Sequence, residues 1–246
     1  MFRQICWAVV AAVIAVLSAS CAGVSDQAPV RGASENPSAP VERPSVNVVD
    51  PSIVRVVAFG CGAPALGTGF AIDDNLIVTN GHIITGRNPE TMSVQRLDGT
   101  EYKAVLVGFD EDVDLALLRV DADANFRPLN LVREVPIVDG VAIGIRTIQD
   151  RNIINEVDFS VDAPVVVNWD GVFRDTESTY RGIRIDADIR KGDSGSPLLI
   201  NNRDVIGLVQ SKTRDLPRGY AVRSSEILDF VDSLDTSVEV VADRCA

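Results

Sequence analysis

Three polar side chains have the types and the setting that nucleophilic catalysis requires. His82, in "TNGHIITG", is the only histidine of the 246 residues, so any histidine-based proton transfer near neutral pH must use it. Ser194 lies in "KGDSGSPLLI", where Gly192 and Gly195 allow a tight turn that presents a hydroxyl and aims backbone N–H groups at an oxyanion. Asp114 lies within the apolar run "VDLALL", where an unpaired carboxylate is costly, and His82 is its natural partner.

Short apolar runs separated by turn residues must position these side chains. The abundance of Val and Ile favours strands, and one helix is predicted near the C-terminus, capped by Ser225. We predict an all-β fold of two six-stranded antiparallel Greek-key barrels, residues 49–132 and 133–246, with that helix at the end of the second. The predicted strands are residues 52–59, 67–73, 75–80, 92–97, 102–109, 113–120, 140–146, 156–169, 179–186, 196–201, 204–212 and 218–223.

The N-terminal region is expected to lie outside this fold. Residues 1–20 carry one positive charge, an apolar run and then small residues, which is typical of a bacterial export signal. Cys21 follows "LSAS", which is similar to a lipidation signal, whereas cleavage after Ala22 or an uncleaved anchor are the alternatives. Residues 21–48 are rich in Pro, Ser, Ala and Gly and are predicted to form a flexible tether. We therefore expect an exported protein of the cell envelope, or a secreted one.

Composition excludes several other classes of function. The formal net charge of -12 argues against nucleic-acid binding, which requires a clustered basic face. One histidine and scattered cysteines argue against a metal site, and no Gly-rich phosphate loop is present, so we predict no metal and no cofactor. The expected partner is a protein or peptide substrate, the expected membrane contact is only an N-terminal lipid or anchor, and the expected state is a monomer.

Three motifs together resemble the trypsin-like serine proteases, especially exported bacterial and actinobacterial members. "GTGFAIDDNLIVTNGHII" is similar to the family's histidine segment, "DVDLALLRV" to its aspartate segment and "KGDSGSPLL" to its serine segment. They follow the family's order at spacings of 32 and 80 residues. The resemblance covers about residues 54–231 and implies the chymotrypsin double-barrel fold and a serine endopeptidase.

The resemblance assigns a role to each motif residue. It implies that Ser194 is the nucleophile, His82 the general base and Asp114 the carboxylate that orients the imidazole, with the N–H groups of Gly192 and Ser194 as the oxyanion hole. Ser196 departs from the glycine that is frequent at its position, and we expect the change to be tolerated. No Ile-Val-Gly-Gly start is present and no PDZ-type region follows the last helix, so neither pancreatic-type activation nor a full high-temperature-requirement-type protease is expected.

Substrate preference and cysteine pairing are less constrained. Asp188 lies six residues before Ser194, the spacing of the acidic floor in trypsin-like members, which implies a preference for Arg or Lys before the cut. Asp188 could instead be a solvated loop residue, and Lys212, on the pocket wall with Gly219, could neutralise it or favour acidic residues. In an exported chain, Cys61 and Cys245 are expected to form a disulfide rather than two free thiols, and the resemblance implies the same bridge.

One reading from a different functional class remains open. A protease-like module without activity could serve in binding or signalling at the cell envelope, but such modules usually lose a triad member or an oxyanion glycine. None of these residues is missing here. The sequence therefore favours the enzyme.

Overall fold

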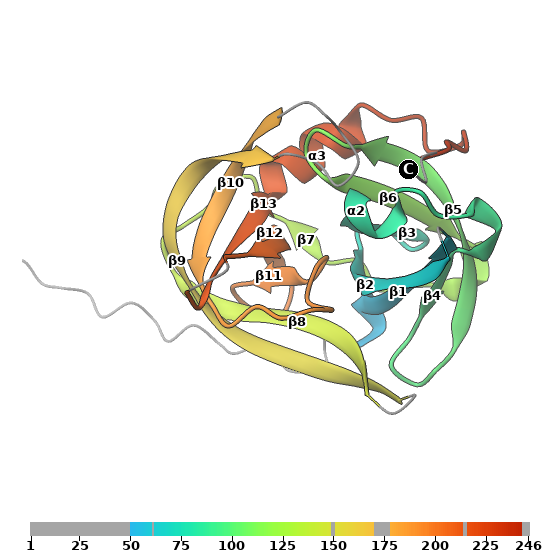
Figure 1. Cartoon of the computed structure of the whole chain (residues 1–246), viewed down its shortest axis with the longest axis horizontal. Helices are drawn as coiled ribbons and strands as arrows, with labels where there is room; N and C mark the ends of the chain where they lie inside the picture. Colours follow the sequence, from blue (N-terminus) through green and yellow to red (C-terminus); the bar gives the residue numbers. More distant parts are fainter. Residues whose placement is uncertain (1–49, 61, 149–150, 170–177, 214–215, 243–246) are drawn as a thin grey trace, which may run out of the picture. The chain divides into compact units, whose positions relative to one another are not determined.

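The computed structural model describes residues 50–60, 62–148, 151–169, 178–213 and 216–242 (Figure 1). All of these residues belong to one compact unit of the chain, residues 38–246. Within the described ranges, no helix has the length and apolar character needed to cross a membrane.

The first half of the described chain forms a closed antiparallel barrel. Its strands follow one another in the order β1-β2-β3-β6-β5-β4, and β4 closes the barrel by pairing with β1. Their alternating apolar residues fill the interior, where Val54, Val56, Ile77 and Leu118 are fully buried. The strands are β1 (Ile53–Gly60), β2 (Ala63–Ala71), β3 (Leu76–Asn80), β4 (Ser93–Gln95), β5 (Glu101–Asp110) and β6 (Leu115–Val120). Short helical turns flank them: η1 (Asp50–Ser52), α2 (Gly81–Ile84), η2 (Pro89–Thr91) and η3 (Ala122–Ala124).

The second half forms a sheet that also closes into a ring. The order is β11-β8-β9-β10-β13-β12-β7, and an additional pairing of β11 with β12 joins the ends of a six-stranded ring. The strands are β7 (Asn130–Leu131), β8 (Asp139–Ile148), β9 (Arg151–Trp169), β10 (Ser178–Asp186), β11 (Pro197–Leu199), β12 (Asp204–Lys212) and β13 (Arg218–Arg223). The two-barrel arrangement and the terminal helix α3 (Ser224–Asp232) are those predicted from the sequence.

Several details differ from the predictions; β2, for example, begins at Ala63 rather than at residue 67. The connection between the barrels contains β7, which pairs with β12 in parallel and lies outside the six-stranded ring. β9 begins at Arg151 rather than at residue 156, because its first residues continue the β8 register to the Arg151–Ile148 pair. Ser225 is not the helix cap: Arg223 is the N-cap residue, and the hydroxyl of Ser224 is used in a hydrogen bond to the carbonyl of Val132.

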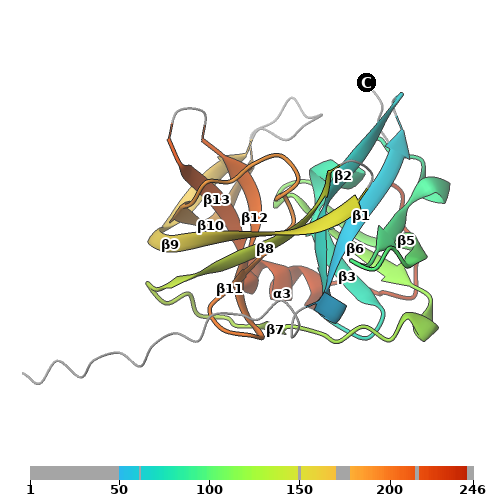
Figure 2. The same ribbon diagram turned by 90° about the horizontal axis from the view of Figure 1, so that it is seen from below.

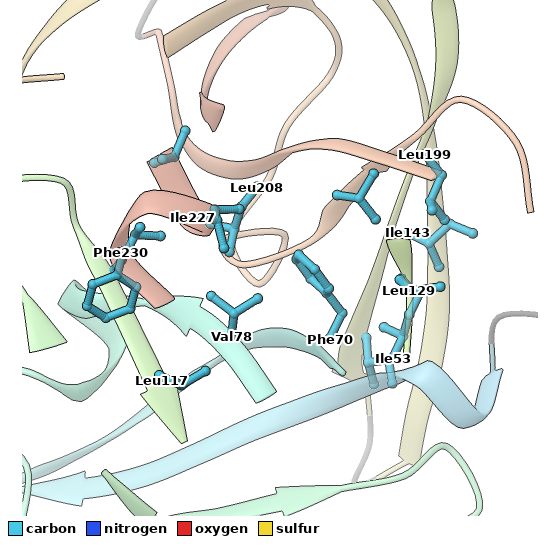
Figure 3. Packing of buried hydrophobic residues seen from close by; sticks show 14 of the residues in the cluster. Ile53, Phe70, Val78, Leu117, Leu129, Ile143, Leu199, Leu208, Ile227 and Phe230 are labelled. Atoms are coloured by element: carbon cyan, nitrogen blue, oxygen red, sulfur yellow. The ribbon is translucent and has the colours of Figure 1, made fainter. Parts of the chain in front are cut away.

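The two barrels share a hydrophobic core. Phe70 and Val78 of the first barrel pack with Leu208 of the second and with Ile227 and Phe230 of α3 (Figure 3). Figure 2 shows the β8–β9 hairpin extending from the second sheet toward the first barrel, where β8 contacts β1 and β2. The shared core and the hairpin fix the loops of one barrel relative to those of the other.

Candidate functional site

His82 and Asp114 are joined by two hydrogen bonds. His82 lies on α2, the helical turn that follows β3, and Asp114 lies directly before β6, the strand that pairs with β3. The His82 Nδ1 atom lies 2.8 Å from Asp114 Oδ2, and the His82 backbone N–H donates to Oδ1 at 2.7 Å. Both carboxylate oxygens therefore hold the same residue, which fixes the imidazole's position and favours the tautomer with a proton on Nδ1.

Asp114 is held in an uncommon backbone conformation. Its φ is 60°, in the left-handed region, and its side chain is 2% exposed. Its carbonyl accepts hydrogen bonds from the Gly81 N–H at 3.0 Å and from Asn80 Nδ2 at 3.2 Å, and Asn80 Nδ2 also lies 3.2 Å from Oδ2. Strain of this kind persists only where the surroundings fix the residue, and here Asn80 and Gly81 do so.

The environment of His82 favours its protonated form. Burial removes water from the imidazole and by itself lowers its pKa, but the negative charge of Asp114 and the hydrogen bond to it outweigh that effect. The pKa of His82 is therefore raised above its ordinary value of 6.5. A raised value strengthens the imidazole as a proton acceptor near neutral pH.

The serine loop has the backbone geometry that its glycines suggested. Gly192 has a φ of 100° and Gly195 a φ of 87°, both in the region that favours glycine. A Cβ on Gly195 would lie 1.8 Å from the Thr68 carbonyl oxygen, so no side chain fits there. Among the described residues, no group accepts a hydrogen bond from the backbone N–H of Gly192 or of Ser194, so both remain available as donors to a ligand. The Ser194 hydroxyl donates to the carbonyl of Gln210 at 3.3 Å.

The buried carboxylate of Asp193 connects this loop to the β8–β9 hairpin. Asp193 is 1% exposed and accepts hydrogen bonds from Arg146 through Nε at 2.9 Å and through Nη2, from Asn155 Nδ2 at 3.0 Å and from the Arg190 N–H at 2.9 Å. Arg146 and Asn155 lie on the neighbouring strands of the β8–β9 hairpin. The bidentate ion pair with Arg146 therefore compensates the buried negative charge of Asp193.

Thr68 of β2 connects the loop to both barrels. Its backbone N–H donates to the Ser194 carbonyl at 2.8 Å, and its hydroxyl donates to the Gly192 carbonyl at 3.0 Å while accepting from the Ile145 N–H at 3.0 Å. The carbonyls on both sides of the loop are thus turned toward β2. Sequence reasoning missed Thr68, Asn80 and Arg146; the "GTGF" and "TNGH" strings contain the first two, but a strand pattern alone does not reveal their partners.

The predicted specificity residues lie around a small cavity, where a neighbouring arginine pairs with the carboxylate of Asp188. A cavity of about 210 Å³ is lined by Asp188, Lys212 and six neighbours, and Gly219 pairs with Lys212 across β12 and β13. Asp188 is 61% exposed and forms an ion pair with Arg190, whose Nε lies 2.9 Å from Oδ2. The hydrogen bond to Arg190, and then the charges of Arg190 and Lys212, lower the pKa of Asp188. Asp188 is therefore an ionised surface residue with a cation already bound.

Several predicted features lie outside the described residues. These are the signal and tether of residues 1–48 and the three cysteines Cys21, Cys61 and Cys245. They stay predictions.

Comparison with known proteins assigns the family. The sequence profile of the trypsin-like peptidase domain matches residues 67–208, more than half of the chain. Serine protease Rv3671c of Mycobacterium tuberculosis (strain ATCC 25618 / H37Rv) is 25% identical over 210 residues, which cover 83% of this chain and 51% of that protein. Serine protease HTRA1 of Xenopus tropicalis is 31% identical over 174 residues, 68% of this chain and 35% of the relative. The chain thus spans about half the length, or less, of these relatives.

Solved structures show the same fold. The active form of the Rv3671c protease from M. tuberculosis matches with a TM-score of 0.72 at 22% identity, covering 89% of this chain and 99% of that one. An inactive form of the Rv3671c protease matches with a TM-score of 0.63 at 23% identity, covering 80% of this chain and 99% of that one. The double-barrel architecture is therefore the chymotrypsin-like fold.

Proposed function

We propose that this chain, which belongs to the trypsin-like peptidase family, is a serine endopeptidase in which Ser194, His82 and Asp114 form the catalytic triad. The observation that carries the residue assignment is the pair of hydrogen bonds from His82 to the buried carboxylate of Asp114. The neighbouring strand β2 is joined to the Ser194 loop by the hydrogen bond from the Thr68 N–H to the Ser194 carbonyl. A buried carboxylate that orients an imidazole is the arrangement that general-base activation of serine requires.

The proposed mechanism follows from these contacts. The Ser194 hydroxyl exchanges the Gln210 carbonyl for His82 Nε2, gives that nitrogen its proton and attacks the scissile carbonyl. The Asp114 carboxylate accepts a hydrogen bond from the Nδ1–H group of His82 and stabilises the imidazolium that forms. The N–H groups of Gly192 and Ser194 stabilise the oxyanion. His82 then protonates the leaving amine. In the second half-reaction His82 takes a proton from water as the water attacks the acyl carbonyl, and it returns a proton to the Ser194 oxygen as the carboxylic acid product leaves.

We propose a preference for basic residues before the cut that is weakened by the protein's own cations. Asp188 is ionised and lines the cavity of about 210 Å³, which supports recognition of Arg or Lys. Arg190 already occupies its carboxylate, and Lys212 lies on the same cavity. A basic substrate side chain would have to displace Arg190, so the preference is expected to be modest.

We further propose that the protein is exported and held at the cell envelope by a lipid on Cys21. The signal-like residues 1–20, the small residues before Cys21 and the tether of residues 21–48 support this proposal. Metabolic labelling with a fatty-acid probe tests it. Incorporation that is lost in Cys21→Ser supports the lipoprotein, and an exported but unlabelled chain supports cleavage after Ala22.

A fluorophosphonate probe tests the triad. We expect one equivalent of label on the full chain, and none on Ser194→Ala or His82→Ala, because the probe requires an activated serine. Ser237→Ala, which removes an exposed hydroxyl from the C-terminal segment, should label like wild type. Absence of labelling from pH 5 to 8, under both oxidising and reducing conditions, would contradict the proposal and favour a binding module without activity.

A peptide library tests the specificity proposal separately. We expect Asp188→Ser to reduce kcat/KM for Arg and Lys substrates several-fold, and Arg190→Ala to increase it, because the second change frees the carboxylate. Lys103→Ala, an exposed cation on β5, is the control for general charge effects. An unchanged preference in Asp188→Ser would remove this residue from substrate recognition.

A further inference from the structure

A second cavity lies away from the triad, between the first barrel and the tip of the β8–β9 hairpin. Its volume is about 640 Å³, within the range of small-ligand sites. It shares no lining residue with the triad or with the cavity beside Asp188. The lining residues are Arg55, Gln95, Leu97, Asp98, Gly99, Arg151 and Asn152.

Arg55 is a buried cation that pairs with no carboxylate among the described residues. It lies on β1 and is 8% exposed, and its Nη1 donates to the side-chain carbonyl of Asn152 at 2.9 Å. Within the part of the chain that the structure describes, no carboxylate lies within ion-pair distance of Arg55 or of the exposed Arg151. Burial lowers the pKa of the Arg55 guanidinium. A desolvated cation of this kind is costly unless an anion compensates it.

The Arg55 side chain is held in position by an amide network. Asn152, at the start of β9, accepts from Arg55 and donates through Nδ2 to Gln95 Oε1 at 3.3 Å and to the Arg96 carbonyl at 3.4 Å. Among the described residues, Nη1 makes the one hydrogen bond of the Arg55 guanidinium, and Arg55 lines the cavity. A fixed guanidinium fork is suited to bidentate binding of a planar carboxylate.

The charge of the lining limits the ligand. Arg55 and Arg151 contribute two positive charges and Asp98 one negative charge, which leaves +1. Asp98 is ionised, since hydrogen bonds from Thr100 and then the charge of Arg96 lower its pKa. A monoanion matches this net charge, whereas a phosphate dianion exceeds it by one negative charge.

We propose that this cavity binds the carboxylate of a peptide, with Arg55 and Arg151 as its ligands. Two sources present the same group: the acidic side chains of the chain's own tether, Asp26, Glu35 and Glu42, and the carboxylate of a separate peptide. The tether precedes β1 in sequence, and Arg55 is the third residue of that strand. The cavity is distinct from the site that hydrolyses substrate.

The position of the cavity connects it to the serine loop. Asn152 lies three residues before Asn155 on β9, a distance of about 10 Å along a strand. Asn155 and Arg146, on the same hairpin, hold the Asp193 carboxylate. A carboxylate that bridges the hairpin tip to β1 therefore stabilises the hairpin from which Asp193 is anchored, and bound peptide is expected to raise kcat. This last consequence rests on the proposed function, but the binding does not.

Binding is measured on the full chain carrying Ser194→Ala, so that peptide is not consumed. The probes are N-acetylated tetra-alanine with a free C-terminal carboxylate, its C-terminal amide, and inorganic phosphate, each titrated by calorimetry. We expect the free acid to bind at least about tenfold more tightly than the amide, because a charge-assisted hydrogen bond is lost in the amide. Equal affinity for acid and amide, or tighter binding of phosphate, would overturn the proposal.

Variants assign the binding to the cavity, because a carboxylate product can also enter the oxyanion site. Arg55→Gln and Arg151→Gln should each weaken binding by about tenfold. Arg151 is exposed, so its variant tests the site even where Arg55→Gln impairs folding. Arg133→Gln, which breaks an exposed ion pair with Asp229, is the matched control and should bind like wild type. Wild-type affinity in Arg151→Gln and in a folded Arg55→Gln would refute the site.

A triple change in the tether distinguishes the two sources. Asp26→Asn, Glu35→Gln and Glu42→Gln together should raise the affinity for added peptide if the tether competes for the cavity. Unchanged affinity assigns the site to a peptide from outside the chain. Both results require that Arg151→Gln weakens the binding of peptide. If Arg151→Gln binds peptide like wild type, the result counts against the proposal. Failure of fluorophosphonate labelling would affect the proposed function and leave these binding measurements unaltered.

Discussion

At the scale of single residues, Asp114 makes most of the hydrogen bonds that hold the His82 side of the site in place. One side chain and one carbonyl accept hydrogen bonds from Asn80, Gly81 and His82, and the residue has a positive φ that few side chains adopt. Aspartate tolerates that conformation better than branched residues do. The backbone bonds to Gly81 and His82 place the imidazole before any substrate arrives, which is the pre-organisation that proton transfer requires.

The pH dependence of activity should report His82 alone. Since the neutral imidazole is the base and its pKa is raised, kcat/KM should increase with pH through a midpoint above 6.5 and then level off. Asp114→Asn should lower both the midpoint and the plateau, the plateau by about 10⁴-fold, because the charge and the tautomer are lost. The measurement is kcat/KM on a peptide substrate from pH 5 to 9.

The ionisation of His82 should also make the free energy of unfolding depend on pH. A raised pKa in the folded state means that protonated His82 stabilises the fold below its unfolded-state pKa, and that this contribution is lost as pH rises through the folded-state pKa. Asp114→Asn should reverse the sign of this dependence of the free energy of unfolding on pH, because burial alone lowers the pKa of His82. A midpoint of the wild-type kcat/KM profile at or below pH 6.5 would contradict the assignment of His82 as a base with a raised pKa, because the chain has no second histidine to account for the titration.

Sequence alone predicted the residues whose chemistry is visible in their type, and missed those that act through position. His82, Asp114 and Ser194 each lie in a recognisable string, and the structure joins the first two directly. Arg146 is one of many arginines until folding brings it to Asp193, 47 residues away. Asp188 was placed by spacing, but spacing does not show that Arg190 pairs with it.

At the scale of elements, the serine loop is positioned by strands of both barrels. β2 supplies Thr68, whose hydroxyl receives the Ile145 N–H of β8 and donates to the Gly192 carbonyl. The β8–β9 hairpin supplies Arg146 and Asn155 to Asp193. The loop therefore depends on the packing of the hairpin against β2, which Figure 2 shows.

Thr68→Val is expected to damage this junction while keeping its shape. The change leaves the buried Ile145 N–H and the Gly192 carbonyl without the hydroxyl, at a cost of about 1–3 kcal/mol for each group left unsatisfied. We expect lower stability in urea unfolding and a fall in kcat, because the Gly192 peptide is no longer held. Thr68→Ser keeps the hydroxyl and should retain most of kcat; equal losses in both variants would assign the effect to packing.

Strands were predicted better than the features at their ends. Alternation and turn residues located every strand of both rings, since strand burial follows directly from apolar pattern. The two-residue β7 was missed because its pairing with β12 depends on tertiary contact alone. Ser225 has the right type for a helix cap, but β13 runs to Arg223 and the helix starts at once, so the cap position falls on Arg223.

At the scale of the whole described unit, the two barrels are joined by a core that belongs to both. Phe70, Val78 and Leu117 from the first barrel meet Leu208 and Ile143 from the second, with α3 closing one side (Figure 3). The site lies on loops from both barrels, so the shared core also sets the distance between His82 and Ser194. A defect in this core should therefore affect both halves together.

Phe70→Ala tests that dependence. Phe70 is fully buried, and truncation of such a side chain costs about 3–5 kcal/mol. We expect the melting midpoint to fall by roughly 10 °C, given about 2–4 °C per kcal/mol for a domain of this size. Because the core is shared, hydrogen exchange should show β1–β6 and β8–β13 losing protection in one transition. Val166→Ala, which shortens a 70%-exposed side chain on β9, should leave the midpoint nearly unchanged. Two separate transitions in Phe70→Ala, with the second sheet keeping its wild-type protection, would show that the barrels fold independently and that their interface does not fix the site.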